Sequence, residues 1–404
     1  MAWCRNLRFA HASPLTADRA LLLAARGLRA FGFGFSAVLV GLHLEHSGLS
    51  PLLIGVTLGV GLAAASLAGL GSVALAARAG RRRTLATVGL LMAASGFDLA
   101  YATQPVLLVL AGVTGMLGIA SIDLGPFAPL EQSALADVVA PEQRNLAFGR
   151  YSMSGGLFNA AGGLSAVFAG AQGGRAYFLL YALIGLATAG LALAMSDQVE
   201  SATRAPAFGA LRRPETLRTL SGLAALFALD AFAGGFVANA VISYWLHVRF
   251  GASPQVLGPV FAAIGFLQAI SYEISGRLSS RIGLINTMVF THLPSNALLL
   301  LVAFSPTLAW AVVLLLARFL LSQMDVPARQ AYTVSIVPPA DRPAAVALTG
   351  AVRGVAQAFG PALAGIAIGA AAFALPFYAG GGLKIAYDVA LFAAFRNRRA
   401  GHEI

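Results

Sequence analysis

Charged residues are scarce in this 404-residue chain: they make up 11% of it, against about 25% in ordinary soluble domains. Hydrophobic residues make up 58% of the chain, and the mean hydropathy is +0.79. A chain with so few hydrated side chains cannot cover a globular surface in water, so a soluble fold is excluded. The composition predicts a protein embedded in a membrane.

Cysteine and lysine are almost absent. Cysteine occurs once, at Cys4, so no disulfide can form within the chain. Lysine occurs once, at Lys384, and arginine supplies all the other basic residues, which suggests a GC-rich bacterial genome. No Walker loop is present, so ATP is not the energy source, and no enzyme signature competes. His43 and His46 are too weak a signal for a metal site, and we expect neither a metal nor a cofactor.

Long apolar segments recur along the whole chain. A bilayer core needs roughly 20 apolar residues per helix, and about twelve segments of that kind are present. We expect helices near residues 20–44, 51–77, 84–102, 105–135, 145–171, 176–195, 219–247, 254–276, 284–303, 307–337, 343–371 and 372–395. The predicted fold class is therefore an all-α polytopic membrane protein with twelve transmembrane helices.

The basic residues are distributed unevenly between the two sides of this arrangement. If the N-terminus is cytoplasmic, eighteen arginines fall in connections on that side and only Arg175 and Arg249 on the other. By the positive-inside rule, both termini are predicted to be cytoplasmic. The net charge of +11 then reflects this asymmetry, and the arginine run at 81–83 is a topological anchor. We expect the lipid bilayer as a partner, and no nucleic acid.

The chain contains an internal repeat. Residues 48–80 align without a gap on 251–283, at an offset of 203, with matching glycine, proline and arginine positions. Residues 128–144, "APLEQSALADVVAPEQR", lie on 326–342, "VPARQAYTVSIVPPADR", at an offset of 198. A polar stretch separates the copies. We therefore expect two six-helix bundles, residues 1–195 and 219–404, joined by a cytoplasmic central loop, 196–218.

At these residues the chain resembles the major facilitator superfamily. The loop signature of that family, Gly-x-Leu-x-Asp-Arg-x-Gly-Arg-Arg, is similar to "VALAARAGRRRTL" at 73–85 and, in part, to "GRLSSRIG" at 276–283. The retained positions are Leu75, Arg78, Gly80, Arg81 and Arg82 in the first copy, and Gly276, Leu278, Arg281 and Gly283 in the second. Ala77 and Ser280 stand where the family has an acid, so the resemblance does not extend to the charge latch that this acid forms.

Charged residues inside the apolar segments are the predicted site, because an ionisable group in a membrane is costly unless it has a partner. Glu131 and Arg329 occupy equivalent repeat positions, and Arg29 and Asp230 lie at nearly the same depth. The resemblance implies that helices 1, 4, 7 and 10 line a central cavity, which would bring these four charges and Gln132 and Gln330 together. Two interpretations stay open: one ion pair within each half, or a gate that pairs the halves.

Other polar residues receive narrower predictions. Asp325 has no obvious basic partner and is, with Glu131, a candidate for proton coupling. Asn239 is a candidate substrate contact. We expect Lys384 and Asp388, four residues apart, to form a helix-surface pair.

Twelve helices with buried charge and no ATP site favour a secondary active transporter. The expected substrate is a small polar or amphipathic molecule moved by alternating access with protons, by a monomer, in the bacterial cytoplasmic membrane. A drug exporter and a nutrient or metal-complex importer both stay open. The alternative is a transporter-fold sensor or assembly factor without flux.

Overall fold

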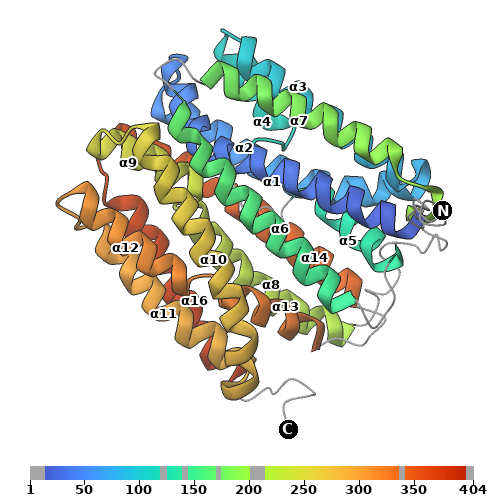
Figure 1. Cartoon of the computed structure of the whole chain (residues 1–404). Helices are drawn as coiled ribbons and strands as arrows, with labels where there is room; N and C mark the ends of the chain where they lie inside the picture. Colours follow the sequence, from blue (N-terminus) through green and yellow to red (C-terminus); the bar gives the residue numbers. More distant parts are fainter. Residues whose placement is uncertain are drawn as a thin grey trace, which may run out of the picture.

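The computed structural model describes residues 14–118, 125–138, 144–169, 174–200, 214–335 and 342–396, which are mostly α-helical and contain no strand. Figure 1 shows the helices as one elongated bundle. The N-half, residues 14–200, holds α1 (Pro14–His46), α2 (Pro51–Ala79), α3 (Arg81–Tyr101), α4 (Pro105–Val113), α5 (Phe127–Val138), α6 (Arg144–Ser165) and α7 (Gly174–Ala194). The C-half, residues 214–396, holds α8 (Pro214–Gly235), α9 (Asn239–Phe250), α10 (Pro254–Ile282), α11 (Leu284–Val302), α12 (Leu308–Leu321), α13 (Asp325–Ser335), α14 (Arg342–Gln357), α15 (Phe359–Gly369) and α16 (Leu375–Phe395).

Helices α2 and α10 begin and end in the same way, as expected of a repeat. Each starts with a proline at its first turn, Pro51 or Pro254, after an extended serine. Each ends at a glycine with nearly the same backbone angles: φ 89° and ψ 157° at Gly80, φ 87° and ψ 162° at Gly283. Glycine reaches a positive φ without a steric penalty. The chain therefore turns into α3 and α11 in the same way.

The structure confirms the all-helical membrane fold. Nine stretches of the described residues are long and apolar enough to cross a membrane. Each of the twelve predicted segments contains at least one helix, but those at 105–135, 145–171 and 372–395 do not reach this criterion. The last of these carries Lys384 and Asp388 within α16. The number of membrane crossings stays a prediction.

Four segments that we predicted as single helices are each divided in two. The divided helices are α4 with α5, α8 with α9, α12 with α13, and α14 with α15. Three of these breaks, those of α8–α9, α12–α13 and α14–α15, are crossed by an apolar stretch of 22 to 31 residues, so hydrophobic length alone could not show them. One break has a direct electrostatic consequence: Asp325 is the first residue of α13, where the helix dipole favours a negative charge.

The halves pack together at the end of the molecule that carries the α1–α2 and α9–α10 turns, here called the turn end. Helix α1 contacts α9, α2 contacts α14 and α15, and α6 contacts α10. Four polar contacts join the halves there, between Ser243 and Val38 O (2.8 Å), Gln255 and Ala169 O (3.1 Å), and Glu45 with both Tyr244 (3.4 Å) and His247 (3.2 Å). The other end of the bundle carries Arg81–Arg83 and is here called the basic end.

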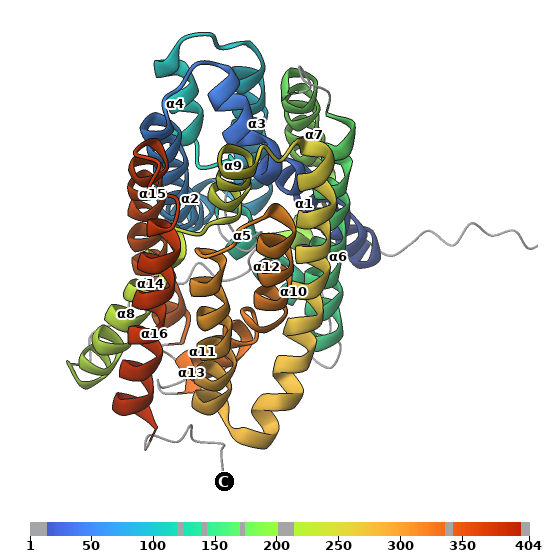
Figure 2. The same ribbon diagram turned by 90° about the vertical axis from the view of Figure 1, so that its left-hand side faces the viewer.

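Glycines allow the closest of these contacts. A Cβ at Gly55 would lie 2.3 Å from the carbonyl oxygen of Pro361, and one at Gly59 would lie 2.3 Å from that of Ala358. Real Cβ atoms do not come so close, so α2 and α15 touch backbone to backbone at these positions. Small residues are typical of helix contacts within membranes, where close backbone approach supplies the packing energy. Figure 2 shows α14 and α15 standing beside α2.

Candidate functional site

A buried ion pair lies inside the N-half. The two nitrogens of the Arg29 guanidinium donate to the two oxygens of Glu131, both at 2.6 Å. Both side chains are buried, 2% and 1% exposed. The hydroxyl of Tyr151 donates to the same carboxylate at 2.9 Å, and the guanidinium stacks on the Phe127 ring at 3.9 Å. A bidentate pair with a further donor satisfies the carboxylate well.

A second arginine lies directly beside this pair. Arg26, one turn before Arg29 on α1, covers the ring of Tyr151 at 4.5 Å. It is buried beneath Gly155 of α6, where an added Cβ would lie 2.7 Å from its Nε atom. Helices α1, α5 and α6 thus hold the two arginines and Glu131 in a fixed arrangement.

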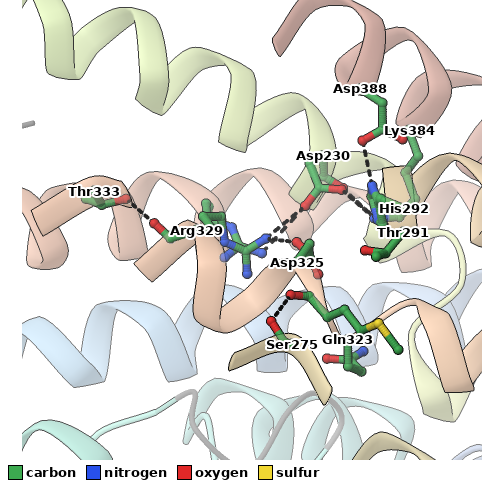
Figure 3. A network of polar contacts seen from close by, with 12 residues as sticks. Asp230, Ser275, Thr291, His292, Gln323, Asp325, Arg329, Thr333, Lys384 and Asp388 are labelled. Carbon is green, nitrogen blue, oxygen red and sulfur yellow. Dashed lines mark hydrogen bonds and ion pairs between the residues drawn. The ribbon is translucent and has the colours of Figure 1, made fainter. Parts of the chain in front are cut away.

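The C-half contains a branched network centred on Asp230 of α8. Lys384 of α16 donates to its carboxylate at 2.5 Å. Arg329 of α13, Arg353 of α14 and His292 of α11 approach the same carboxylate at 3.5, 3.7 and 3.8 Å. Figure 3 shows Asp230 between Arg329 on one side and Lys384 and His292 on the other. One carboxylate thereby connects five helices.

Asp325 is the second carboxylate of this network. It accepts a hydrogen bond of 2.6 Å from Arg329, one turn later on α13. The expectation that Asp325 has no basic partner is therefore wrong: the spacing of four residues places Arg329 on the same helical face. Arg329 lies between two acids, Asp325 at 2.6 Å and Asp230 at 3.5 Å.

Asp388 of α16 is the third carboxylate, and it is fully buried. It contacts Nδ1 of His292 at 2.8 Å and accepts from Asn296 at 2.9 Å. The predicted helix-surface pair of Lys384 and Asp388 is therefore wrong. Both side chains point into the C-half because α16 packs against α8 and α11 there, and each finds a partner on another helix. His292 bridges Asp388 and Asp230 through its two ring nitrogens.

Arg318 of α12 has buried donor atoms that make no hydrogen bond. Arg318 is 5% exposed, and its guanidinium lies over the Phe319 ring, 4.6 Å from the ring centre. Its Nε and Nη1 atoms are buried and make no hydrogen bond. Arg318 interacts electrostatically with Asp230 and Asp325, but both already accept short hydrogen bonds from Lys384 and Arg329.

The predicted site residues thus fall into two separate groups. Arg29 pairs with Glu131, and Arg329 with Asp325 and Asp230, each within its own half. In this conformation Glu131 and Arg329 do not pair with each other. Asn239 begins α9 and is half-buried. The side chains of Gln132 and Gln330 lie outside the part of the chain that the structure describes.

The loop signature is held by an acid from another part of the chain. The Glu200 carboxylate accepts from the backbone amides of Arg81 and Arg82, at 2.6 and 3.2 Å, and so caps the first turn of α3. Arg82 also pairs with Asp197. Gly80 leaves room for this cap, since a Cβ there would lie 2.8 Å from Glu200 Oε1. Leu75 and Arg78 are exposed, as is Arg281 in the second copy, while Leu278 and Gly283 are half-buried. The burial of Gly276 and the side chain of Ser280 lie outside what the structure describes.

The sequence prediction missed several residues of the C-half network. It did not include His292, Asn296, Arg318 or Arg353. A signal was present in the sequence: His292 with Asn296 and Lys384 with Asp388 are polar pairs four residues apart inside apolar segments. Such residues are rare in membranes and mark functional or paired positions.

Comparisons with known proteins agree with this architecture. The sequence model of the Major Facilitator Superfamily matches residues 22–322 and 224–403. An uncharacterized membrane protein of Saccharomyces cerevisiae is 22% identical over 422 residues, covering 94% of each chain. Among solved structures, a peptide transporter POT in complex with sulfate has a TM-score of 0.76 at 16% identity, covering 93% of each chain. The nucleoside transporter NupG has a TM-score of 0.75 at 14% identity, covering 94% of this chain and 100% of its own.

The family match extends over nearly the whole chain and includes both halves. The similar solved structures are transporters rather than enzymes, and the apolar helices make the protein a multi-pass membrane protein. The chain therefore belongs to the Major Facilitator Superfamily, whose members carry small molecules across membranes.

Proposed function

We propose that the protein is a secondary active transporter that moves a small polar or amphipathic solute by alternating access. The observation that carries this proposal is the buried network on α8, α11, α13, α14 and α16 in a chain of this family. Buried charges shared among five helices would cost stability in a passive scaffold. A site that must change partners during a transport cycle gives them a purpose.

The conformation fits one state of such a cycle. The polar and glycine contacts between the halves lie at the turn end. Under the positive-inside rule the basic end would be cytoplasmic, and contacts at the opposite end support an inward-facing state. The two halves, residues 1–195 and 219–404, would rock about their contacts, with 196–218 as the connection between them.

Proton coupling is the second part of the proposal, and the shared position of Arg329 supports it. If Asp325 takes up a proton, it no longer neutralises Arg329, whose remaining acid is Asp230 at 3.5 Å. Arg329 would then compete with Lys384 and Arg353 for Asp230. Protonation at one end of the network thereby changes ion pairs on neighbouring helices. Glu131 is the less favoured coupling residue, because Arg29 and Tyr151 already satisfy it.

The test begins with the purified full-length protein and a thermal-shift screen of metabolites, metals and drugs. Solutes that stabilise the protein are then assayed for counterflow and for pH-driven uptake in proteoliposomes. We expect saturable flux of at least one stabilising solute, driven by a pH gradient. Binding without any flux would instead support a sensor or assembly factor, and would overturn the transport proposal.

A further inference from the structure

Among the described residues, the C-half network holds more permanent positive charges than carboxylates. Four permanent cations, Arg318, Arg329, Arg353 and Lys384, face three carboxylates, Asp230, Asp325 and Asp388. With a neutral His292, one positive charge is therefore in excess. An unneutralised charge inside a membrane protein is costly unless a ligand or water compensates it.

The excess is located at Arg318. Its Nε and Nη1 atoms are buried without a hydrogen bond, and the residue is 5% exposed. The two carboxylates that interact electrostatically with Arg318 are Asp230 and Asp325. Both already accept a hydrogen bond, Asp230 from Lys384 at 2.5 Å and Asp325 from Arg329 at 2.6 Å. A buried donor that makes no hydrogen bond is unfavourable. The guanidinium fork of Arg318 can therefore take an acceptor that the described residues do not provide.

Other unused polar atoms accompany Arg318. Ser322, one turn further along the chain, has a buried hydroxyl without a partner, and so does Tyr387. The Nε atom of Arg353 is likewise buried and makes no hydrogen bond. Arg353 and Tyr387 both interact electrostatically with Asp230 and Asp325, as Arg318 does. The unused donors of Arg318, Arg353 and Tyr387 thus lie within electrostatic range of the same two acids.

We propose that the solute is an anion whose carboxylate or phosphate group is bound by Arg318, with Arg353 as a second donor. The inference rests on the proposed transport function and names its substrate class. An oxyanion offers the two acceptor atoms that a guanidinium fork matches. It also cancels the excess positive charge of the network, which a neutral or cationic solute would leave uncompensated.

The test uses the purified full-length protein and matched pairs of probes: benzoate with benzamide, succinate with succinamide, and uridine monophosphate with uridine, together with inorganic phosphate. Thermal shifts give the binding constants. We expect at least one anion to stabilise the protein while its neutral partner does not. The carboxylate pairs and the phosphate probes show which oxyanion is preferred.

Variants then locate the site. Arg318→Gln is expected to weaken binding of the stabilising anion by about tenfold or more, the size expected for a lost charge-assisted hydrogen bond. Arg277→Gln is the matched control, because that arginine is 79% exposed. Arg318→Lys keeps the charge without the fork, and we expect intermediate affinity from it. The lysine variant and the wild-type comparison of probe pairs decide the question even if Arg318→Gln fails to fold.

The outcomes separate the two proposals. Equal stabilisation by anions and their neutral partners, no stabilisation by any anion, or full affinity in both Arg318 variants would overturn the anion site. Saturable flux of a neutral solute alone would also overturn it, while leaving the transporter intact. Anion binding that depends on Arg318 but produces no flux would support the site and contradict transport.

Discussion

The two halves treat their buried charges differently. In the N-half, Glu131 is fully engaged by the fork of Arg29 and the hydroxyl of Tyr151. In the C-half, Asp230 is shared by Lys384, Arg329, Arg353 and His292, at distances from 2.5 to 3.8 Å. An ion pair whose carboxylate already accepts all these hydrogen bonds stabilises a single arrangement of its helices. A carboxylate with several competing partners can exchange them at low cost, so we assign structure to the N-half pair and function to the C-half network.

Breaking the N-half pair should have the largest effect on stability. Glu131→Ala leaves the Arg29 guanidinium buried without a carboxylate, which we expect to cost about 3–5 kcal/mol of folding free energy. Combining it with Arg29→Met should restore most of that loss, because neither charge then remains. Thermal unfolding in detergent measures both. A double variant as unstable as the single one would show that the pair does more than neutralise charge.

Removing the corresponding C-half pair should reduce transport rather than folding. In Asp325→Asn with Arg329→Gln, Asp230 keeps Lys384 as its close partner at 2.5 Å, so the loss of stability should be at most about 1–3 kcal/mol. Flux of the solute in proteoliposomes should fall at least about tenfold, the effect of about 1.4 kcal/mol on a rate. Wild-type flux in this variant would contradict the functional assignment of the C-half.

The contact between the halves offers a smaller perturbation. Gly59→Ala places a Cβ where it would lie 2.3 Å from the Ala358 carbonyl oxygen, and overpacking of this kind costs about 1–3 kcal/mol. We expect the turn end to open more often. In a background with Cys4→Ser, the variant Ser243→Cys reports opening, because Ser243 is buried between α9 and α1.

Labelling of that cysteine by a membrane-impermeant maleimide should be faster with Gly59→Ala. Gly190→Ala is the matched control, since nothing lies within 4 Å of an added Cβ there. Equal labelling rates in the two variants would show that the α2–α15 contact does not control closure.

The cap of α3 should give the smallest effect. Glu200→Gln replaces the carboxylate that accepts from the amides of Arg81 and Arg82, and so weakens the helix cap. Loss of a helix cap costs about 1 kcal/mol of folding free energy. Glu273→Gln is the control, because the exposed Glu273–Arg277 pair is worth at most about 0.5 kcal/mol. Thermal unfolding that is more sensitive to Glu273 than to Glu200 would contradict the role of the cap.

The sequence could assign each charged residue a position along its helix, but not the direction of its side chain. Repeat offsets placed Glu131 and Arg329 at equivalent levels because position along a helix is linear in sequence. Which way each side chain points depends on how the helices rotate and pack. Lys384 and Asp388 therefore appeared to be a surface pair, yet both face inward toward α8 and α11.

Other features of the C-half differ in whether a local sequence pattern could predict them. The Asp325–Arg329 pair is local, four residues apart, and could have been predicted from spacing alone. The break that begins α13 at Asp325 is not visible in hydrophobicity, because one apolar stretch, Leu308–Arg329, runs across it. The sharing of Asp230 among α11, α13, α14 and α16 is a tertiary property that no local pattern encodes.

The central claim is that the C-half network carries coupled transport while the N-half pair maintains the fold. Its most direct test compares solute-induced proton movement in proteoliposomes that contain a pH-sensitive dye, using Arg29→Met with Glu131→Leu and Asp325→Asn with Arg329→Gln. We predict that the N-half double variant retains the pH change and that the C-half double variant loses it. The reverse pattern, with the signal lost in the N-half variant and kept in the C-half variant, would contradict the account.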